Sequence, residues 1–118
     1  MKSTMLDHSG LKFHTGASKI QVKPCQIIRL EAMSNYTKVY FADHLPIVMA
    51  KVLGAYEELL RPHGFVRINH SHLVNLEHIR EVDEQGIVQM RDNSSLKFSR
   101  RKRNDALILI MNQNVVTA

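Results

Sequence analysis

The stretch FVRINHSHLVNLEHIREV, residues 65–82, changes character twice along its length. Phe65 to Ile68 is rich in β-type residues and predicts a strand. Three polar residues, Asn69 to Ser71, then interrupt the pattern before apolar residues resume at Leu73. Because serine is a preferred N-cap residue, Ser71 is predicted to begin a short helical turn that carries the next apolar residues inward. The polar interruption is therefore expected to be a turn and helix cap between two buried segments.

Short β-type runs separated by turn residues lie on both sides of this stretch. Their lengths fit strands better than helices. The predicted strands are Ile20–Val22, Ile27–Ala32, Tyr36–Phe41, Phe65–Ile68, Glu81–Asp83, Ile87–Met90 and Leu96–Phe98. Asn35 lies between the second and the third of these, and asparagine tolerates the positive φ that hairpin turns often require. The sequence therefore predicts a β-hairpin around Asn35.

Two segments change to a helical period. Near residues 48–60 the apolar positions recur at helical spacing, and Pro62 with Gly64 ends the segment. Near residues 100–112 an apolar stripe recurs, and Ser99 can cap its first turn. The sequence therefore predicts a mainly β fold with short helices.

The size of the chain fits one domain, because 118 residues with 44% apolar content suffice for a single modest core. We expect residues 1–15 to form a flexible leader and residues 16–118 to form the domain. The single cysteine, Cys25, excludes an internal disulfide and suits a reducing compartment. No apolar run approaches the length of about 18 residues that a membrane-spanning helix needs, and the N-terminus lacks a signal-peptide pattern. The sequence therefore predicts a cytoplasmic protein with no membrane partner.

The chain is basic, with a formal net charge of +5. Such a surface favours an anionic partner, either a nucleic acid or an acidic membrane face. Four consecutive basic residues, Arg100 to Arg103, fall at the predicted start of the last helix. The helix dipole disfavours cations at this end, so a nearby phosphate would relieve the cost of placing them there.

Polar or basic residues gather at the ends of three predicted strands, in the segments Asn35 to Lys38, Asn69 to Ser71 and Ser99 to Arg103. Asn, His and Arg can hydrogen-bond to base edges, while Lys, Ser and Thr commonly hold phosphates. These are the residue types that a DNA-binding surface uses. Residue chemistry alone also allows a turn with a helix cap in the second segment and a solvated basic surface in the third.

Three ordered segments carry a resemblance to a known family: LEAMSNYTKVYF, LLRPHGFVRINHSHLVNLEHIREV and LKFSRRKRNDAL. Together they resemble the LytTR DNA-binding domain of bacterial transcription regulators over roughly residues 16–112. The most specific element matches at Phe65, Arg67, Ser71, Val74 and Asn75.

The resemblance implies an elongated arrangement of small antiparallel sheets that binds specific duplex DNA sequences. In such domains three loops, rather than a recognition helix, enter successive major grooves. The residues expected to contact bases are Arg101, Arg100, His70, Asn69, Thr37 and Lys38. The residues expected to contact the DNA backbone are Asn35, Ser71, Ser99, Lys102 and Arg103. Asn69 to Ser71 then becomes an exposed tip that the flanking apolar residues hold rigid.

Three further motif residues have other expected roles. Asn75 is assigned to a turn or cap, and Arg67 to a surface ion pair or a phosphate. For Tyr36, packing in the core of the hairpin and contact with DNA are equally expected.

The resemblance also bears on partners. Family members tend to act in pairs on direct repeats, so a dimer on DNA is expected. Many are response regulators of two-component systems and carry an N-terminal receiver domain, and we expect no receiver domain within these 118 residues.

Three other classes of function compete with duplex DNA binding. A metal site at His70, His72 and His78 lacks a recognisable zinc pattern, and no catalytic motif is found, so we predict neither an enzyme nor a cofactor. An RNA-binding or single-strand module would need aromatic stacking platforms, for which 6% aromatic residues is a low content. A protein-interaction domain could instead use an exposed strand edge.

Overall fold

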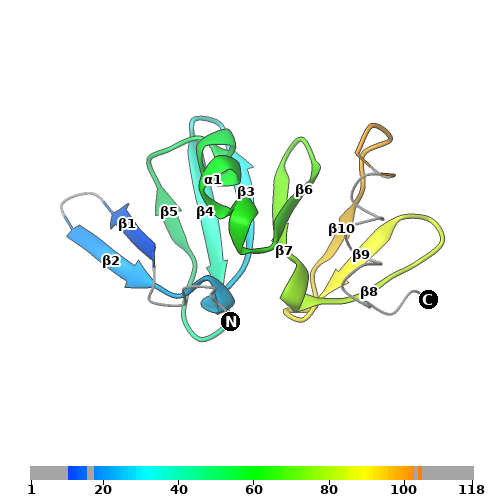
Figure 1. Cartoon of the computed structure of the whole chain (residues 1–118), viewed down its shortest axis with the longest axis horizontal. Coiled ribbons are helices and arrows are strands. Elements are labelled where there is room, and N and C mark those ends of the chain that lie inside the picture. The colour runs from blue at the N-terminus through cyan, green and yellow to red at the C-terminus, as the bar shows by residue number, and fades with distance from the viewer. Residues whose placement is uncertain (1–10, 16–17, 103, 105–118) are drawn as a thin grey trace.

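The protein is described by a computed structural model that covers residues 11–15, 18–102 and 104, with side chains described from residue 21 onward. Within this part of the chain, ten strands form three antiparallel sheets, and the single α-helix is short (Figure 1). The principal extents are 43 × 38 × 23 Å, and the sheets follow one another along the longest axis. The predicted mainly β arrangement of small antiparallel sheets is confirmed.

The central sheet has five strands in the order β5-β4-β3-β7-β6. Their bounds are β3 Ile27–Met33, β4 Tyr36–Phe41, β5 Ile47–Met49, β6 Phe65–Asn69 and β7 His72–Asn75. Helix α1, Leu53–Leu60, covers one face of this sheet and is followed by the 3-10 helix Arg61–His63. Gly64 then takes a φ of 83°, a left-handed conformation that favours glycine, and so turns the chain into β6.

The central sheet is flanked by two smaller sheets. On one side β1, Leu11–Thr15, pairs with β2, Ser18–Val22. On the other side β8 Ile79–Val82, β9 Ile87–Met90 and β10 Ser95–Lys97 form a three-stranded sheet in the order β10-β9-β8. Two further 3-10 helices, Pro24–Gln26 and Leu76–His78, precede β3 and β8.

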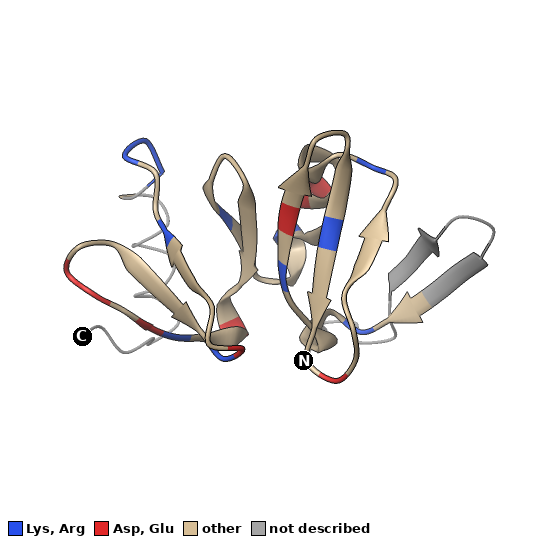
Figure 2. Cartoon of the chain, turned by 180° about the vertical axis from the view of Figure 1, so that it is seen from behind, with Lys and Arg blue, Asp and Glu red and all other residues tan. Residues whose placement is uncertain are grey.

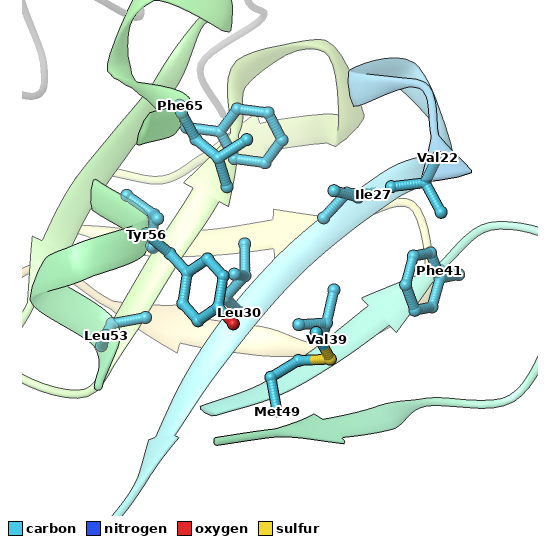
Figure 3. Close-up of a cluster of buried hydrophobic side chains, with 11 residues drawn as sticks. Val22, Ile27, Leu30, Val39, Phe41, Met49, Leu53, Tyr56 and Phe65 are labelled. Carbon is cyan, nitrogen blue, oxygen red and sulfur yellow. The ribbon is translucent and has the colours of Figure 1, made fainter. Parts of the chain in front are cut away.

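Two hydrophobic cores form on opposite faces of the central sheet. Figure 3 shows the first, in which Leu53 and Tyr56 of α1 point toward Leu30, Val39 and Met49 of the sheet. The second lies between the central sheet and the three-stranded sheet. Its members from the central sheet are Ile28, Ile68 and Val74, and its other members include Val82, Val88 and Met90.

The stretch 65–82 folds differently from the prediction at Ser71. Ser71 caps no helical turn, because His72–Asn75 is a strand that pairs with both β6 and β3. Leu73 belongs to the first core and Val74 to the second. Successive side chains of a strand point to opposite faces, so two adjacent apolar residues are both buried when a strand has a core on each side.

The β3–β4 hairpin is confirmed, with Met33 opposite Tyr36. The positive φ of its turn falls on Ser34, at 55°, rather than on the expected Asn35.

Other predicted boundaries also differ from the structure; the strands expected at Ile20–Val22, Glu81–Asp83 and Leu96–Phe98 are Ser18–Val22, Ile79–Val82 and Ser95–Lys97. The helix expected near residues 48–60 begins only at Leu53, because Ile47–Met49 pairs with β4 and buries Met49 in the first core. Within the leader expected over residues 1–15, Leu11–Thr15 forms β1, while residues 1–10 lie outside the described residues. Of the helix expected near residues 100–112, the structure describes only residues 100–102 and 104.

Among the described residues, no helix has both the length and the apolar character that crossing a bilayer requires.

Candidate nucleic-acid interface

Three turns lie at one edge of the molecule, and we call this edge the turn edge. They are the β3–β4 turn at residues 34–35, the β6–β7 turn at residues 70–71 and the segment 99–102 that follows β10. Figure 1 shows all three at its upper side, and Figure 2 shows the same arrangement from behind. The first 3-10 helix and the β9–β10 turn lie at the opposite edge. The three segments that the sequence singled out are therefore brought together.

Hydrogen bonds join the turns laterally. The N–H of Ala32, beside the first turn, donates to the carbonyl oxygen of Ser71 in the second at 2.8 Å. The N–H of Ser99 in the third turn donates to the carbonyl oxygen of Ile68, next to the second, also at 2.8 Å. The β6–β7 turn is thus bonded on both sides, and the turn edge is one connected structure rather than three independent loops.

The β6–β7 turn exposes His70 and is held from below by Arg67. Arg67 Nε donates to the carbonyl oxygen of Asn69 at 3.2 Å, and Nη2 donates to that of His70 at 2.6 Å. Its Nη1 forms an ion pair with Glu57 of α1 at 2.9 Å. The expected ion-pair role of Arg67 is confirmed, and the same guanidinium also fixes the backbone that carries His70.

Residues 99–102 form a turn that places two arginines in solvent and leaves Lys102 half-buried. Ser99 Oγ accepts a hydrogen bond from the N–H of Lys102 at 3.2 Å, which is the geometry of an N-cap. Arg100 and Arg101 are exposed, and no ion pair within the described part of the chain involves either of them. In Figure 2 this turn is the longest basic stretch along the turn edge. Arg103 lies outside the described residues.

In the β3–β4 hairpin, the base contact expected of Thr37 is wrong. Thr37 is fully buried, and its hydroxyl donates to the carbonyl oxygen of Lys51 at 2.8 Å, so it presents no surface to a ligand. Tyr36 is 52% exposed, which rules out the hairpin-core alternative. Asn35 is exposed in the turn, whereas Lys38 is half-buried and lies inward along β4, opposite Glu31. Lys38 Nζ is 5.1 Å from the centre of the Tyr40 ring.

Lys51 is a cation at the turn edge that the sequence interpretation missed. It is exposed in the connection between β5 and α1, and the bond from Thr37 holds that connection beside the β3–β4 turn. A single helix over residues 48–60, as the sequence predicts, places Lys51 within that helix and not in an exposed connection. Only one residue between β5 and α1, Lys51 itself, is polar, so the sequence carries only a weak signal of a break there.

A model of the LytTr DNA-binding domain family matches residues 17–110, which is most of the chain. The chain belongs to this family. The fold of the LytTr domain is similar to the solved structure of a LytTr DNA-binding domain from Bacillus cereus, with a TM-score of 0.69 and 21% sequence identity. That similarity covers 86% of this chain and 95% of the other. No curated protein matches the chain.

On one face of the β3–β4 pair of the LytTr domain, the charged side chains pair with one another. Arg29 pairs with Asp92 of the β9–β10 turn at 3.2 Å and lies over the Tyr40 ring, 3.6 Å from its centre. The Tyr40 hydroxyl donates to Glu31 at 2.8 Å. Because these charges are paired, the positive charge offered to an anionic ligand comes from cations outside this face, such as Arg100 and Arg101.

Two pKa values on this face are shifted. Burial lowers the pKa of His72 below its ordinary value; Glu31 opposes this effect and Arg29 adds to it. Burial alone would raise the pKa of Asp92, but hydrogen bonds from Ser94 and the guanidinium of Arg29 outweigh it and lower the pKa. Both groups therefore favour their unprotonated forms in the folded LytTr domain.

Asn75 has the structural role expected of it. Its side chain is fully buried, donates to the carbonyl oxygens of Pro24 and Ile27 at 3.2 and 2.9 Å, and accepts from the N–H of Glu77 at 3.0 Å. The amide thus connects the start of β3 to the 3-10 helix after β7.

The histidines of the rival metal site have separate surroundings. His72 Nε2 is 3.8 Å from Glu31, whereas His78 Nε2 donates to the carbonyl oxygen of Cys25 at 2.7 Å. Among the described residues, no group of three or more His, Cys, Asp or Glu side chains is arranged to hold a metal ion.

Proposed function

We propose that this LytTr domain binds specific sequences of duplex DNA in the cytoplasm as part of a bacterial transcription regulator. The three turns of the turn edge enter successive major grooves, and no catalytic step is involved. One observation carries the proposal: the turns lie along one edge, are hydrogen-bonded to one another and include exposed arginines without ion pairs. The two half-buried arginines, Arg29 and Arg67, are paired with acids elsewhere.

Base recognition falls to the exposed side chains of the second and third turns. Arg101, with Arg100 beside it, reads guanine through two parallel hydrogen bonds, a contact that gives about 1–3 kcal/mol of discrimination. His70 reads a base from the β6–β7 turn, where Arg67 holds its backbone. Lys38 can extend from the sheet face toward a base beside the first turn.

Phosphate contacts position the domain and are independent of sequence. We assign them to Asn35, Ser71, Ser99, Lys102 and Arg103. Lys51 joins this group on structural grounds, because it is exposed next to the first turn and Thr37 fixes its backbone.

The test is selection of bound duplexes from a random pool by the full chain. We expect one sequence motif to emerge and to bind at least about a hundredfold more tightly than scrambled duplex, since specific complexes exceed non-specific ones by about a thousandfold or more. Recovery of random sequences, or equal competition by RNA or single strands, would overturn the proposal. A motif repeated in the same orientation would support binding in pairs on direct repeats, and a solitary motif would contradict that part.

A further inference from the structure

Both polar atoms of the Asn69 side chain have hydrogen-bond partners within the protein. Its Nδ2 donates to the carbonyl oxygen of Lys97 at 2.6 Å, and its Oδ1 accepts from the N–H of Ser71 at 2.7 Å. His72 Nδ1 also lies 3.2 Å from Oδ1. A carbonyl can only accept and a backbone N–H can only donate, so these two partners fix which way the amide points.

These contacts conflict with reading a base. An asparagine recognises adenine by presenting its oxygen and its nitrogen together, one as acceptor and one as donor. In Asn69 both of these atoms already have protein partners, so turning the amide edge toward a base would compete with the bonds to Lys97 and Ser71. Losing the bond to Ser71 would also loosen the turn that carries His70. The neighbouring His70, which is exposed, has no such conflict.

The bond to Lys97 instead determines how two turns are related. Lys97 is the last residue of β10, two residues before Ser99. The N–H of Ser99 already donates to the carbonyl oxygen of Ile68. Ile68, Leu96 and Phe98 pack together in the second core, and a second hydrogen bond between the two segments further restricts how one can turn relative to the other. Asn69 supplies this second bond.

We propose that Asn69 is a positioning residue for DNA recognition: without touching DNA, it fixes the β6–β7 turn relative to residues 99–102 and so lets His70 and Arg101 contact their bases together. This inference rests on the proposed function. It replaces the base contact expected of Asn69 from the sequence.

The first test is a double-mutant cycle with Asn69→Ala and Arg101→Ala, measured on the duplex that the wild-type chain selects. We expect Asn69→Ala to weaken binding to this duplex about tenfold and to change binding to scrambled duplex less than about twofold. In the Arg101→Ala background the same change should have little further effect. Additive losses would mean that Asn69 makes a contact of its own and would overturn the proposal.

A base-substitution scan of the selected duplex gives an independent test. Positioning predicts that Asn69→Ala reduces discrimination at the base pairs that Arg101→Ala and His70→Ala also affect. Loss at a base pair that neither of those variants affects would identify a direct contact and contradict the inference.

The variant Asn69→Ser distinguishes the bond to Ser71 from the bond to Lys97. A serine hydroxyl can still accept from the N–H two residues on, but it is too short to reach Lys97. We expect Asn69→Ser to lose specificity as Asn69→Ala does, while thermal unfolding shows that both variants stay folded. Wild-type specificity in Asn69→Ser, or equal losses on selected and scrambled duplex, would overturn the positioning role. Failure of the wild-type chain to select any motif would instead reject the proposed function.

Discussion

Arg67 uses all three guanidinium nitrogens: one for Glu57 and two for the backbone carbonyls of the β6–β7 turn. A lysine could keep the charge but not this planar fork. The hydrogen bonds to the turn therefore depend on the arginine side chain itself and not on its charge alone.

We expect Arg67→Lys to lower the free energy of unfolding by about 1–3 kcal/mol, because hydrogen bonds from a charged donor are lost. Arg61 is a matched control, since it pairs with the same Glu57 at 3.4 Å but its side chain is 62% exposed. Arg61→Lys should change stability by less than about 0.5 kcal/mol. Urea denaturation of both variants measures the difference, and equal losses would contradict the role given to the carbonyl bonds.

His72 makes stability depend on pH. Its pKa is lowered in the folded state, so the unfolded chain binds the proton more tightly. Stability is therefore unaffected well above the ordinary value of 6.5 and falls as the pH drops through and below it. We expect the free energy of unfolding to decrease between about pH 7.5 and 5.5, and to decrease less in His72→Gln. Identical pH profiles would exclude His72 as the cause.

Asp92 acts in a different pH range. Its folded-state pKa lies below the ordinary value of 3.8, so its contribution is present above that value and is lost only in stronger acid. The two groups therefore weaken the fold in successive steps as the pH falls.

At the scale of elements, β7 contributes adjacent residues to both cores, and β3 and β6 also contribute to both. We expect Leu73→Ala to lower the free energy of unfolding by about 2–5 kcal/mol, because it leaves a cavity in the first core. Val74→Ala should destabilise the second core by less, since fewer atoms are removed. Val48 is 53% exposed, and Val48→Ala provides a near-neutral control. Chemical denaturation compares the three variants, and a small effect at Leu73 would contradict its burial.

Most elements could be predicted from the sequence because their local patterns are strong. The β3–β4 hairpin and the strands 87–90 and 65–68 have alternating or apolar runs bounded by turn residues. Ser71 was misassigned because adjacent apolar residues fit a helical turn as well as a strand buried on both faces. The start of α1 was misassigned because three residues of β5 are too short a run to show a period.

The site was predictable to the level of its turns but not of every side chain. The resemblance identified three segments, and strand alternation with Val39 and Phe41 could have indicated that Thr37 faces the core. The engagement of Asn69 could not be foreseen, because its partner Lys97 is 28 residues away and the contact depends on how two sheets pack.

At the scale of the whole molecule, exposed lysines lie at both edges. Lys51 lies beside the β3–β4 turn, whereas Lys23 precedes the 3-10 helix at the start of β3, at the opposite edge. Both are exposed.

We expect Lys51→Ala to weaken binding to selected and scrambled duplex alike and to reduce the slope of log affinity against log salt by about 1. Lys23→Ala should leave that slope unchanged. Titrations between about 50 and 200 mM salt measure both variants. A larger effect from Lys23 would mean that DNA contacts the other edge.

The placement of Leu73 and Val74 in different cores affects how the molecule unfolds. The three-stranded sheet cannot detach without uncovering Val74 on a strand whose other side still holds Leu73 in the first core. Unfolding of the three-stranded sheet therefore destabilises the central sheet, and unfolding of the central sheet destabilises the three-stranded sheet. Although it is built around two apolar centres, the protein should lose its structure cooperatively, and the part that carries residues 99–102 should not open on its own while the rest stays intact.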